Sequence, residues 1–313
     1  MKLLHTASEL QPGAQPVCAA IGIFDGVHRG HQELLRQTLA DARACGGLAV
    51  AITFDCHPNV IVAPQRVPSL IQTLSQRLES LGTLGMDAVL LLHFDHALSE
   101  QGGETFVRSL AAELGRLRRL CVGADFVFGH RRSGNVALLR QLGAELGFQV
   151  HGLPAVAAGG HVISSTRIRE TIRHGDFAAA AGWLGRPYAL AGRVVEGDKL
   201  GRQLGFPTAN LEVGGLVLPP NGVYATAAAL GPVRRRSVTN IGLRPTLAEP
   251  APSLHVETHL LGFTGDLYGQ LLEIQFLGRL REERQFASLE QLQRQIGQDI
   301  AAARPWFERE KEF

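Results

Sequence analysis

The sequence predicts two domains of different class: an N-terminal α/β domain with a doubly wound parallel sheet, and a small C-terminal antiparallel β-barrel with a terminal helix. At 313 residues the chain exceeds the size of one ordinary hydrophobic core. In its first half, short apolar runs alternate with amphipathic segments of helical length, whereas β-rich runs later follow one another across Gly and Pro turns. The pattern changes near Arg186-Pro187, which gives predicted domains 1–185 and 186–313.

In the first half, the alternation predicts crossover units, which place helices on both faces of a parallel sheet. The expected strands are residues 17–24, 48–54, 88–94, 120–123 and 148–152. The expected helices are residues 31–45, 74–84, 106–114 and 136–146.

In the second half, successive strands without helical crossovers indicate a small antiparallel barrel. The expected strands are residues 188–195, 223–230, 237–241, 254–261 and 271–277. One helix is expected over 289–303, with Ser288 as its N-cap and Gln291 completing a capping box. Pro305 is expected to end this helix, because proline lacks the N–H that a helix interior needs.

Composition excludes several classes of function. The formal net charge is only +2, so we expect no nucleic-acid partner, and the run 234–236 of three arginines is better explained as a solvated strand end. No stretch reaches the ~20 apolar residues of a membrane span. The four cysteines form no Cys-x-x-Cys pair, which argues against a disulfide scaffold or zinc ribbon. We expect a cytoplasmic protein with small-molecule partners; the pattern specifies no oligomeric state.

The first expected strand runs into the segment 22–31, where a helix begins. In a parallel sheet, ligands bind at the carboxyl ends of strands, and a helix N-terminus there attracts phosphate. His28 and His31 are three residues apart and can face one pocket, while Gly26 and Gly30 allow the backbone to approach a ligand. Two incidental surface histidines are the simpler interpretation, but the whole combination favours a phosphate site, with Phe24 as a further contact.

This segment is similar to the His-x-Gly-His signature of the nucleotidylyltransferase superfamily. The resemblance implies transfer of AMP from ATP with release of pyrophosphate, with His28 and His31 as catalytic residues. Such chemistry requires no protein nucleophile, because the attacking phosphate is already anionic. It requires stabilisation of charge on the α-phosphate and on the leaving pyrophosphate.

Three further segments, 53–58, 122–134 and 163–169, follow in order, and the last opens a helix. Together they resemble the FMN adenylyltransferase half of the prokaryotic bifunctional riboflavin kinase/FAD synthetase, over about residues 15–183. The resemblance implies ATP contacts at Ser164, Ser165, Thr166 and Arg169. It also gives candidates for the FMN-binding loops: Asp55, His57, Asp125, Phe126, Phe128 and Arg132.

Two departures from that family bear on loop rigidity and on one phosphate or flavin contact. The family usually has proline where Cys56 stands and a basic residue where Val127 stands. These departures keep open an alternative, in which the N-terminal half binds flavin or nucleotide without catalysis.

The segment 192–211 is the most specific stretch of the second half. Its glycines, Gly197, Gly201 and Gly205, indicate a loop that covers polyphosphate, with Arg202 and Thr208 as further ATP contacts. Thr208 and Asn210 lie two residues apart, so on a strand they share one side, where their oxygens suit Mg²⁺. For an arbitrary protein, a Gly-rich barrel turn would be the better interpretation.

The segment nevertheless resembles the Pro-Thr-Ala-Asn motif of riboflavin kinases, and the resemblance covers about residues 186–302. Supporting segments follow in family order at 220–225, 239–242, 245–246, 256–259, 266–269 and 281–286. The resemblance implies that Glu257 removes the proton of the ribityl hydroxyl while ATP delivers its γ-phosphoryl group. Without it, Glu257 would be taken for a solvent-facing strand residue, and His259 is given only a packing role.

The implied cofactor is Mg²⁺, and ATP, riboflavin, FMN and FAD are the implied substrates or products. A different nucleotidylyltransferase, acting on pantetheine phosphate or nicotinamide mononucleotide, would leave the second half unexplained. A non-catalytic flavin-binding or regulatory protein is the competing hypothesis from another class.

Overall fold

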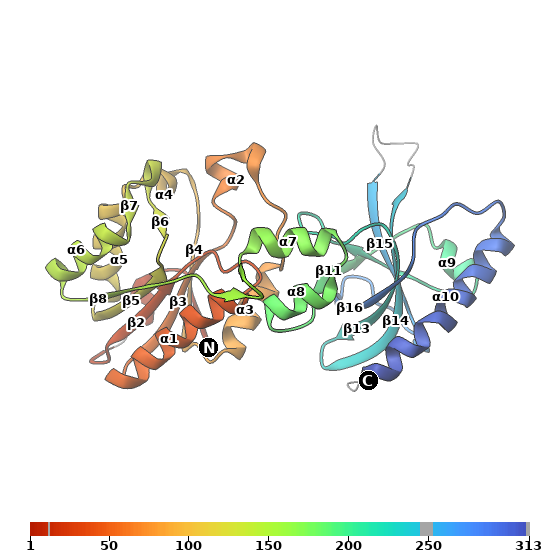
Figure 1. The fold of residues 1–313 in the computed structure, drawn as a ribbon, viewed down its shortest axis with the longest axis horizontal. Coiled ribbons are helices and arrows are strands. Elements are labelled where there is room, and N and C mark those ends of the chain that lie inside the picture. Colours follow the sequence, from red (N-terminus) through yellow and green to blue (C-terminus); the bar gives the residue numbers. More distant parts are fainter. Residues whose placement is uncertain (12, 245–252, 311–313) are drawn as a thin grey trace. The chain divides into compact units, whose positions relative to one another are not determined.

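The computed structural model describes residues 1–11, 13–244 and 253–310. The chain divides into two compact units, here called the sheet unit, Met1–Ser165, and the barrel unit, Thr166–Phe313 (Figure 1). The segment 245–246, expected to belong to the kinase motif set, lies outside the described residues.

The sheet unit contains a six-stranded sheet in the order β1-β4-β3-β2-β5-β8. All neighbouring strands are parallel, which confirms the predicted doubly wound sheet. The strands are β1 Lys2–Leu4, β2 Val17–Ile21, β3 Leu48–Phe54, β4 Ala88–Leu92, β5 Leu117–Gly123 and β8 Gln149–Leu153. Two short hairpins accompany them, β6 Val127–Phe128 with β7 Gly134–Asn135, and β9 Ala157–Ala158 with β10 His161–Val162.

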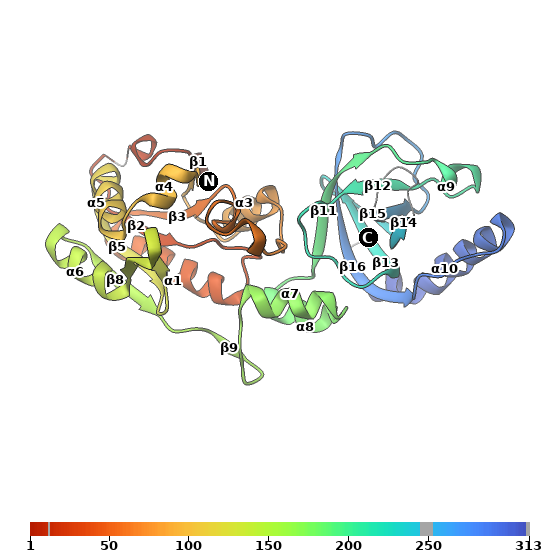
Figure 2. The ribbon, with the colours of Figure 1, turned by 90° about the horizontal axis from the view of Figure 1, so that it is seen from above.

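Helices cover both faces of this sheet, because side chains alternate along each strand between two hydrophobic cores (Figure 2). One core packs α1 Arg29–Cys45 and α3 Leu74–Thr83 against one face. The other packs α5 Gly103–Leu114 and α6 Val136–Leu146 against the opposite face. The short elements are α2 Asn59–Val62, α4 His96–Glu100, η1 Ala7–Leu10, η2 Pro64–Arg66 and η3 His130–Arg132.

The strand order reverses between β2 and β5. From β2 the chain proceeds outward through β3 to β4, and β5 then adds on the other side of β2, followed by β8. At such a reversal the connections leave in opposite directions, which opens a crevice outside the carboxyl ends of the two strands. The segments that follow β2 and β5 therefore flank the position where this sheet class binds ligands.

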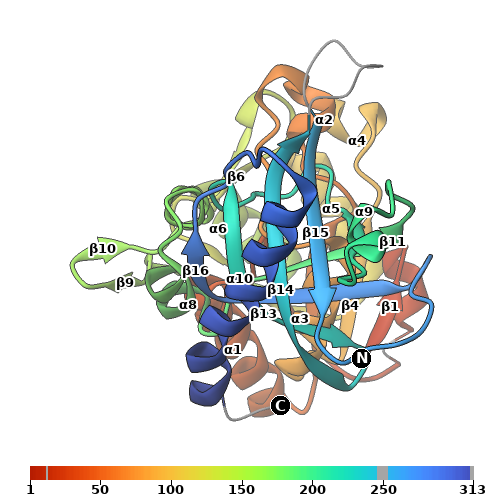
Figure 3. The same cartoon turned by 90° about the vertical axis from the view of Figure 1, so that its right-hand side faces the viewer.

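The barrel unit contains a closed barrel in the order β11-β12-β15-β14-β13-β16, with every pair antiparallel (Figure 3). This confirms the predicted C-terminal architecture. The strands are β11 Ala189–Val195, β12 Ala209–Glu212, β13 Gly222–Leu230, β14 Val233–Arg244, β15 Ser253–Leu260 and β16 Leu271–Arg281. The helices are α7 Ser165–Arg173, which begins at the division, α8 Phe177–Leu184, α9 Leu200–Gln203 and α10 Leu289–Arg309.

The predicted end of the last helix is wrong. Ser288 caps α10 as expected, accepting from the Gln291 N–H at 3.3 Å, while the Gln291 side chain reaches back to the N–H of Ala287. Pro305, however, lies inside α10, which continues to Arg309. Ala303 and Phe307, on either side of the proline, are both buried in the core that α10 shares with the barrel. This packing outweighs the ~3 kcal/mol that an interior proline costs.

Among the residues that the structure describes, none of the helices combines the length and apolarity needed to cross a bilayer.

Helix α8 packs on the barrel, so a stable fragment of the second domain should include this helix. Phe177 stacks on Phe276 at 5.0 Å between ring centroids and meets Tyr224 edge-on at 5.7 Å. The predicted boundary at residue 186 would remove this helix from the barrel, and it stays a prediction. We expect a fragment of residues 186–313 to be about 2 kcal/mol or more less stable to unfolding than one of residues 166–313.

Urea denaturation of the two fragments measures this difference. Phe177→Ala in the longer fragment should reproduce much of the loss. Equal unfolding free energies for the two fragments would show that α8 adds nothing to the barrel.

Candidate active sites

The turn between β2 and α1 is strained and strongly held. Phe24 and Val27 adopt positive φ angles of 53° and 38°, a conformation that costs a β-branched residue such as valine particularly much. The buried carboxylate of Asp25 accepts from the Ile71 N–H at 2.9 Å. The hydroxyl of Ser165, at the start of α7, donates to the Asp25 carbonyl oxygen at 3.0 Å. These contacts fix the turn, and sequence reasoning did not single out Asp25.

His28 and His31 lie against each other at the start of α1. The buried His28 is the N-cap, and its Nδ1 accepts from the His31 N–H at 3.3 Å. The two rings stack with centroids 3.6 Å apart. A Cβ at Gly30 would lie 3.2 Å from the His28 ring, so a larger residue at this position would crowd the ring.

The surroundings keep His31 neutral. Burial, reinforced by the neighbouring His28 and Arg77, holds the pKa of His31 well below its ordinary value. Within the described part of the chain, the buried Nδ1 of His31 has no hydrogen-bond partner. Arg77, which sequence reasoning missed, is itself buried and donates to the carbonyls of Ile23 at 2.7 Å and Phe54 at 2.5 Å. A helix N-terminus, an arginine and two imidazoles at the switch point form an environment suited to an anion.

The segment after β3 is anchored to the end of β4. Asp55 accepts from the Phe94 N–H at 3.1 Å, and its other oxygen lies 2.5 Å from His93 Nδ1. Burial alone would raise the pKa of Asp55, but the hydrogen bonds from His93 and Phe94 outweigh it and lower that pKa. The Cys56 thiol lies 3.7 Å from the Phe94 carbonyl oxygen, and His57 Nδ1 accepts from the Asn59 N–H at 3.1 Å.

The segment after β5 separates into packed and exposed residues. Phe126 and Phe128 stack on each other at 5.3 Å and pack against the core beneath β5. Asp125, Val127 and Arg132 are exposed. The aromatic pair therefore supports the segment, whereas the exposed residues are the ones that solvent and ligands can reach.

The predicted ATP contacts at the start of α7 differ in exposure. Ser164 and Ser165 are half-buried in the sheet unit, next to the turn that holds Gly26. Thr166 is exposed and Arg169 is buried, and both belong to the barrel unit by the division of the chain.

In the barrel unit, Glu257 lies in the middle of a polar row. Its strand β15 pairs with β12 on one side and β14 on the other, and Glu257 is in register with Asn210 and Asn240. Directly paired residues point to the same face of a sheet. The Thr208 hydroxyl, just before β12, donates to a carboxylate oxygen of Glu257 at 3.4 Å. Sequence reasoning assigned no role to Asn240.

The glycine loop passes close to this row. A Cβ at Gly197 would lie 2.2 Å from the Asn210 amide nitrogen, and one at Gly201 would lie 2.5 Å from the Phe206 carbonyl oxygen. The Oδ1 atom of Asn210 is buried and has no hydrogen-bond partner among the residues that the structure describes. Such an oxygen beside a hydroxyl and a carboxylate is suited to a hard cation.

A cavity of about 260 Å³ opens beside Thr208. Its lining includes Arg202, Asp266 and Tyr268, and thus brings the glycine loop together with the 266–269 segment of the sequence motif. Gly205, by contrast, is exposed at the turn that ends the loop, with a φ of 86°.

Comparisons with known proteins match both units. A family model described as FAD synthetase matches residues 10–167, and one described as riboflavin kinase matches residues 184–307. The bifunctional riboflavin kinase/FMN adenylyltransferase of Escherichia coli K12 is 38% identical over 309 residues, covering 98% of each chain. That of Pseudomonas fluorescens is 38% identical over 304 residues, covering 97% of each chain.

A solved structure from Streptococcus pneumoniae, titled a macrolide-efflux protein, superposes with a TM-score of 0.82 at 27% identity, covering 97% of this chain and 98% of that one. Its title describes a different activity from the two family models. Because both models match and the named relatives align over nearly their whole length, the chain belongs to the family of bifunctional riboflavin kinase/FMN adenylyltransferases.

Proposed function

We propose that the family's two reactions are divided between the units. The sheet unit adenylates FMN to FAD around His28 and His31, and the barrel unit phosphorylates riboflavin to FMN around Glu257. The observation that carries the first assignment is the stacked imidazole pair at a helix N-terminus on the switch point. The second rests on the register of Glu257 with Asn210 beside Thr208. We place both reactions in the cytoplasm, where ATP is available.

In the adenylyl transfer, an oxygen of the FMN phosphate bonds to the α-phosphorus of ATP while the bond to the bridging oxygen breaks and pyrophosphate leaves. Negative charge builds on the oxygens around that phosphorus. The His28 imidazole is the proposed hydrogen-bond donor to these oxygens, and the Arg77 charge and the α1 N-terminus add positive potential. Ser164 and Ser165 of the sheet unit remain proposed contacts of the same ATP.

In the kinase reaction, Glu257 accepts the proton of the terminal ribityl hydroxyl, whose oxygen bonds to the γ-phosphorus as ADP leaves. Thr208 Oγ1 and the buried Asn210 Oδ1, which no described residue hydrogen-bonds, fit Mg²⁺ as oxygen ligands. When bound there, Mg²⁺ supplies positive charge to the phosphates. The close approach of Gly197 to Asn210 supports a loop that covers these phosphates.

Loss of either histidine should impair only the adenylation of FMN to FAD. We expect His28→Ala or His31→Ala to lower FAD formation from FMN by about two to four orders of magnitude, because charge-stabilising donors are lost. FMN formation from riboflavin should hardly change. Rates measured separately from FMN and from riboflavin test this, with the exposed His96→Ala as the control. Equal damage to both activities would mean that the turn is structural for the whole chain.

Replacing Glu257, the proposed base, should impair only the phosphorylation of riboflavin to FMN. Glu257→Gln keeps size and polarity but cannot accept the ribityl proton, so single-turnover FMN formation should fall by about 10²–10⁴ at saturating substrates. The exposed Glu212→Gln on β12 serves as the control. A rate within a few-fold of the parent would remove Glu257 from the mechanism.

The proposed Mg²⁺ ligands should respond to the metal concentration. Thr208→Ala and Asn210→Ala should raise the Mg²⁺ concentration needed for half-maximal kinase rate, and more Mg²⁺ should partly restore the rate. Asn210→Asp, which keeps an oxygen at this position, should be less affected than Asn210→Ala. An unchanged Mg²⁺ dependence in all three variants would exclude these residues as ligands.

A further inference from the structure

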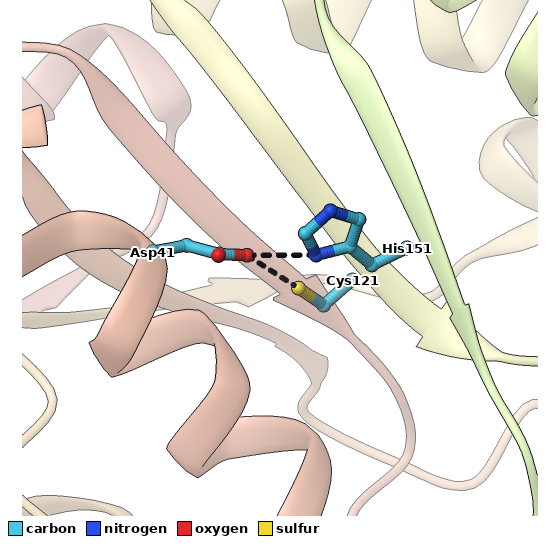
Figure 4. A group of neighbouring side chains, drawn as sticks. All are labelled: Asp41, Cys121 and His151. Carbon is cyan, nitrogen blue, oxygen red and sulfur yellow. Dashed lines mark hydrogen bonds and ion pairs between the residues drawn. The ribbon is translucent and has the colours of Figure 1, made fainter. Parts of the chain in front are cut away.

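A second group of functional side chains lies in the sheet unit, away from the β2–α1 turn: Asp41, Cys121 and His151 (Figure 4). Asp41 lies on α1, thirteen residues after His28 and hence about 20 Å further along the helix axis. Cys121 lies on β5 and His151 on β8. None of the three belongs to either proposed reaction.

The backbone brings these residues together. Cys121 and His151 are register partners on adjacent parallel strands, so their side chains point to the same face of the sheet. Asp41 reaches this face from α1, and one of its oxygens, Oδ2, lies 3.0 Å from His151 Nδ1 and 3.5 Å from Cys121 Sγ. The three ligand atoms all lie within 4.8 Å of one another. Figure 4 shows the Asp41 carboxylate pointing toward both the His151 ring and the Cys121 thiol.

The other carboxylate oxygen of Asp41, Oδ1, is fixed by two hydrogen bonds. Oδ1 accepts from Arg119 Nη1 at 2.9 Å and from Gln37 Nε2 at 3.0 Å. These bonds fix the carboxylate so that Oδ2 faces the thiol and the imidazole. Ligating carboxylates in metal sites are typically oriented by such hydrogen bonds from a surrounding layer of residues.

We propose that Asp41 Oδ2, Cys121 Sγ and His151 Nδ1 bind a divalent metal ion of the zinc class. Bond lengths of about 2.0–2.3 Å in a tetrahedral site put neighbouring oxygen, nitrogen and sulfur ligands about 3.3–3.5 Å apart. The observed separations from Oδ2, 3.0 and 3.5 Å, are close to these values. A mixed set of oxygen, nitrogen and sulfur ligands suits Zn²⁺ better than Mg²⁺ or Ca²⁺.

Binding leaves the ion pair of Asp41 with Arg119 in place. The metal takes the position of the hydrogens that His151 and Cys121 share with Oδ2. The thiol proton passes to solvent as the sulfur–metal bond forms, and the His151 ring stays neutral by losing its Nδ1 proton to solvent while Nε2 takes one up. The side chain of His151 is 36% exposed, which gives the ion a path of entry and room for water as a fourth ligand. The role is structural, because the ion would join α1 to β5 and β8 while lying far from the β2–α1 turn.

The test uses the full chain, stripped with chelator and titrated with Co²⁺ in the presence of excess Mg²⁺. We expect about one tightly bound Co²⁺ per chain, with a thiolate-to-cobalt charge-transfer band and the visible bands of tetrahedral Co²⁺. Cys121→Ser and His151→Gln should each abolish the high-affinity binding. Cys56→Ser, which removes a half-buried thiol elsewhere, should leave the spectrum unchanged.

Zn²⁺ at a large excess over its Kd should raise the Tm of the sheet unit in the parent by about 5 °C or more, and this shift should vanish in His151→Gln. His151→Gln keeps the test valid if the buried Cys121→Ser variant does not fold. Two results would overturn the proposal. If the parent protein shows no thiolate-to-cobalt band, the cluster is only a hydrogen-bonded carboxylate. If the band persists in Cys121→Ser or in His151→Gln, the metal binds elsewhere.

Discussion

The buried carboxylate of Asp25 is the contact on which the sheet unit's site depends. It receives backbone N–H groups from Ile71 and Gln72, which lie before α3, and so fixes a turn whose residues Phe24 and Val27 have unfavourable positive φ angles. Each such residue costs about 1–3 kcal/mol unless its surroundings hold it. Because the turn is held, α1 begins at Arg29 with His28 as its N-cap, and the imidazole pair lies at the carboxyl end of β2.

Arg77 completes this arrangement from the opposite direction. By donating to the carbonyls that follow β2 and end β3, it ties two neighbouring strand ends together and brings a buried positive charge near His31. A neutral imidazole, a fixed guanidinium and a helix N-terminus give a site whose potential exists before any phosphate arrives. Preorganised charge of this kind is what a reaction without a protein nucleophile requires.

Much of the fold could be predicted from the sequence because periodicity reports local geometry and burial. The residues 48–54 alternate between two cores and form β3 over the full predicted span. The three-residue β1 carries too little pattern to be recognised. Pro305 misled the prediction because the helix around it is stabilised by tertiary contacts of Ala303 and Phe307, which no local rule contains.

In the sites, too, local features could be predicted from the sequence and long-range contacts could not. The spacing of His28 and His31, or of Thr208 and Asn210, lies within a few residues and could be read directly. The Asp25 bond to Ile71 spans 46 residues and the Arg77 bond to Ile23 spans 54, so neither has a local signal. Asn240 comes beside Glu257 only through the pairing of β14 with β15. An alignment of many relatives could have found such positions; the single sequence could not.

In the proposed mechanism two separate sites act in succession, with FMN released from one and bound by the other. One measurement tests it directly: riboflavin, ATP and Mg²⁺ are given to a mixture of the His31→Ala and Glu257→Gln proteins, and the flavins are separated by chromatography. We expect the mixture to form FAD, although neither protein alone does so at a comparable rate, because free FMN passes from the intact barrel of one to the intact sheet unit of the other. A mixture that forms no more FAD than the two proteins do separately would contradict it.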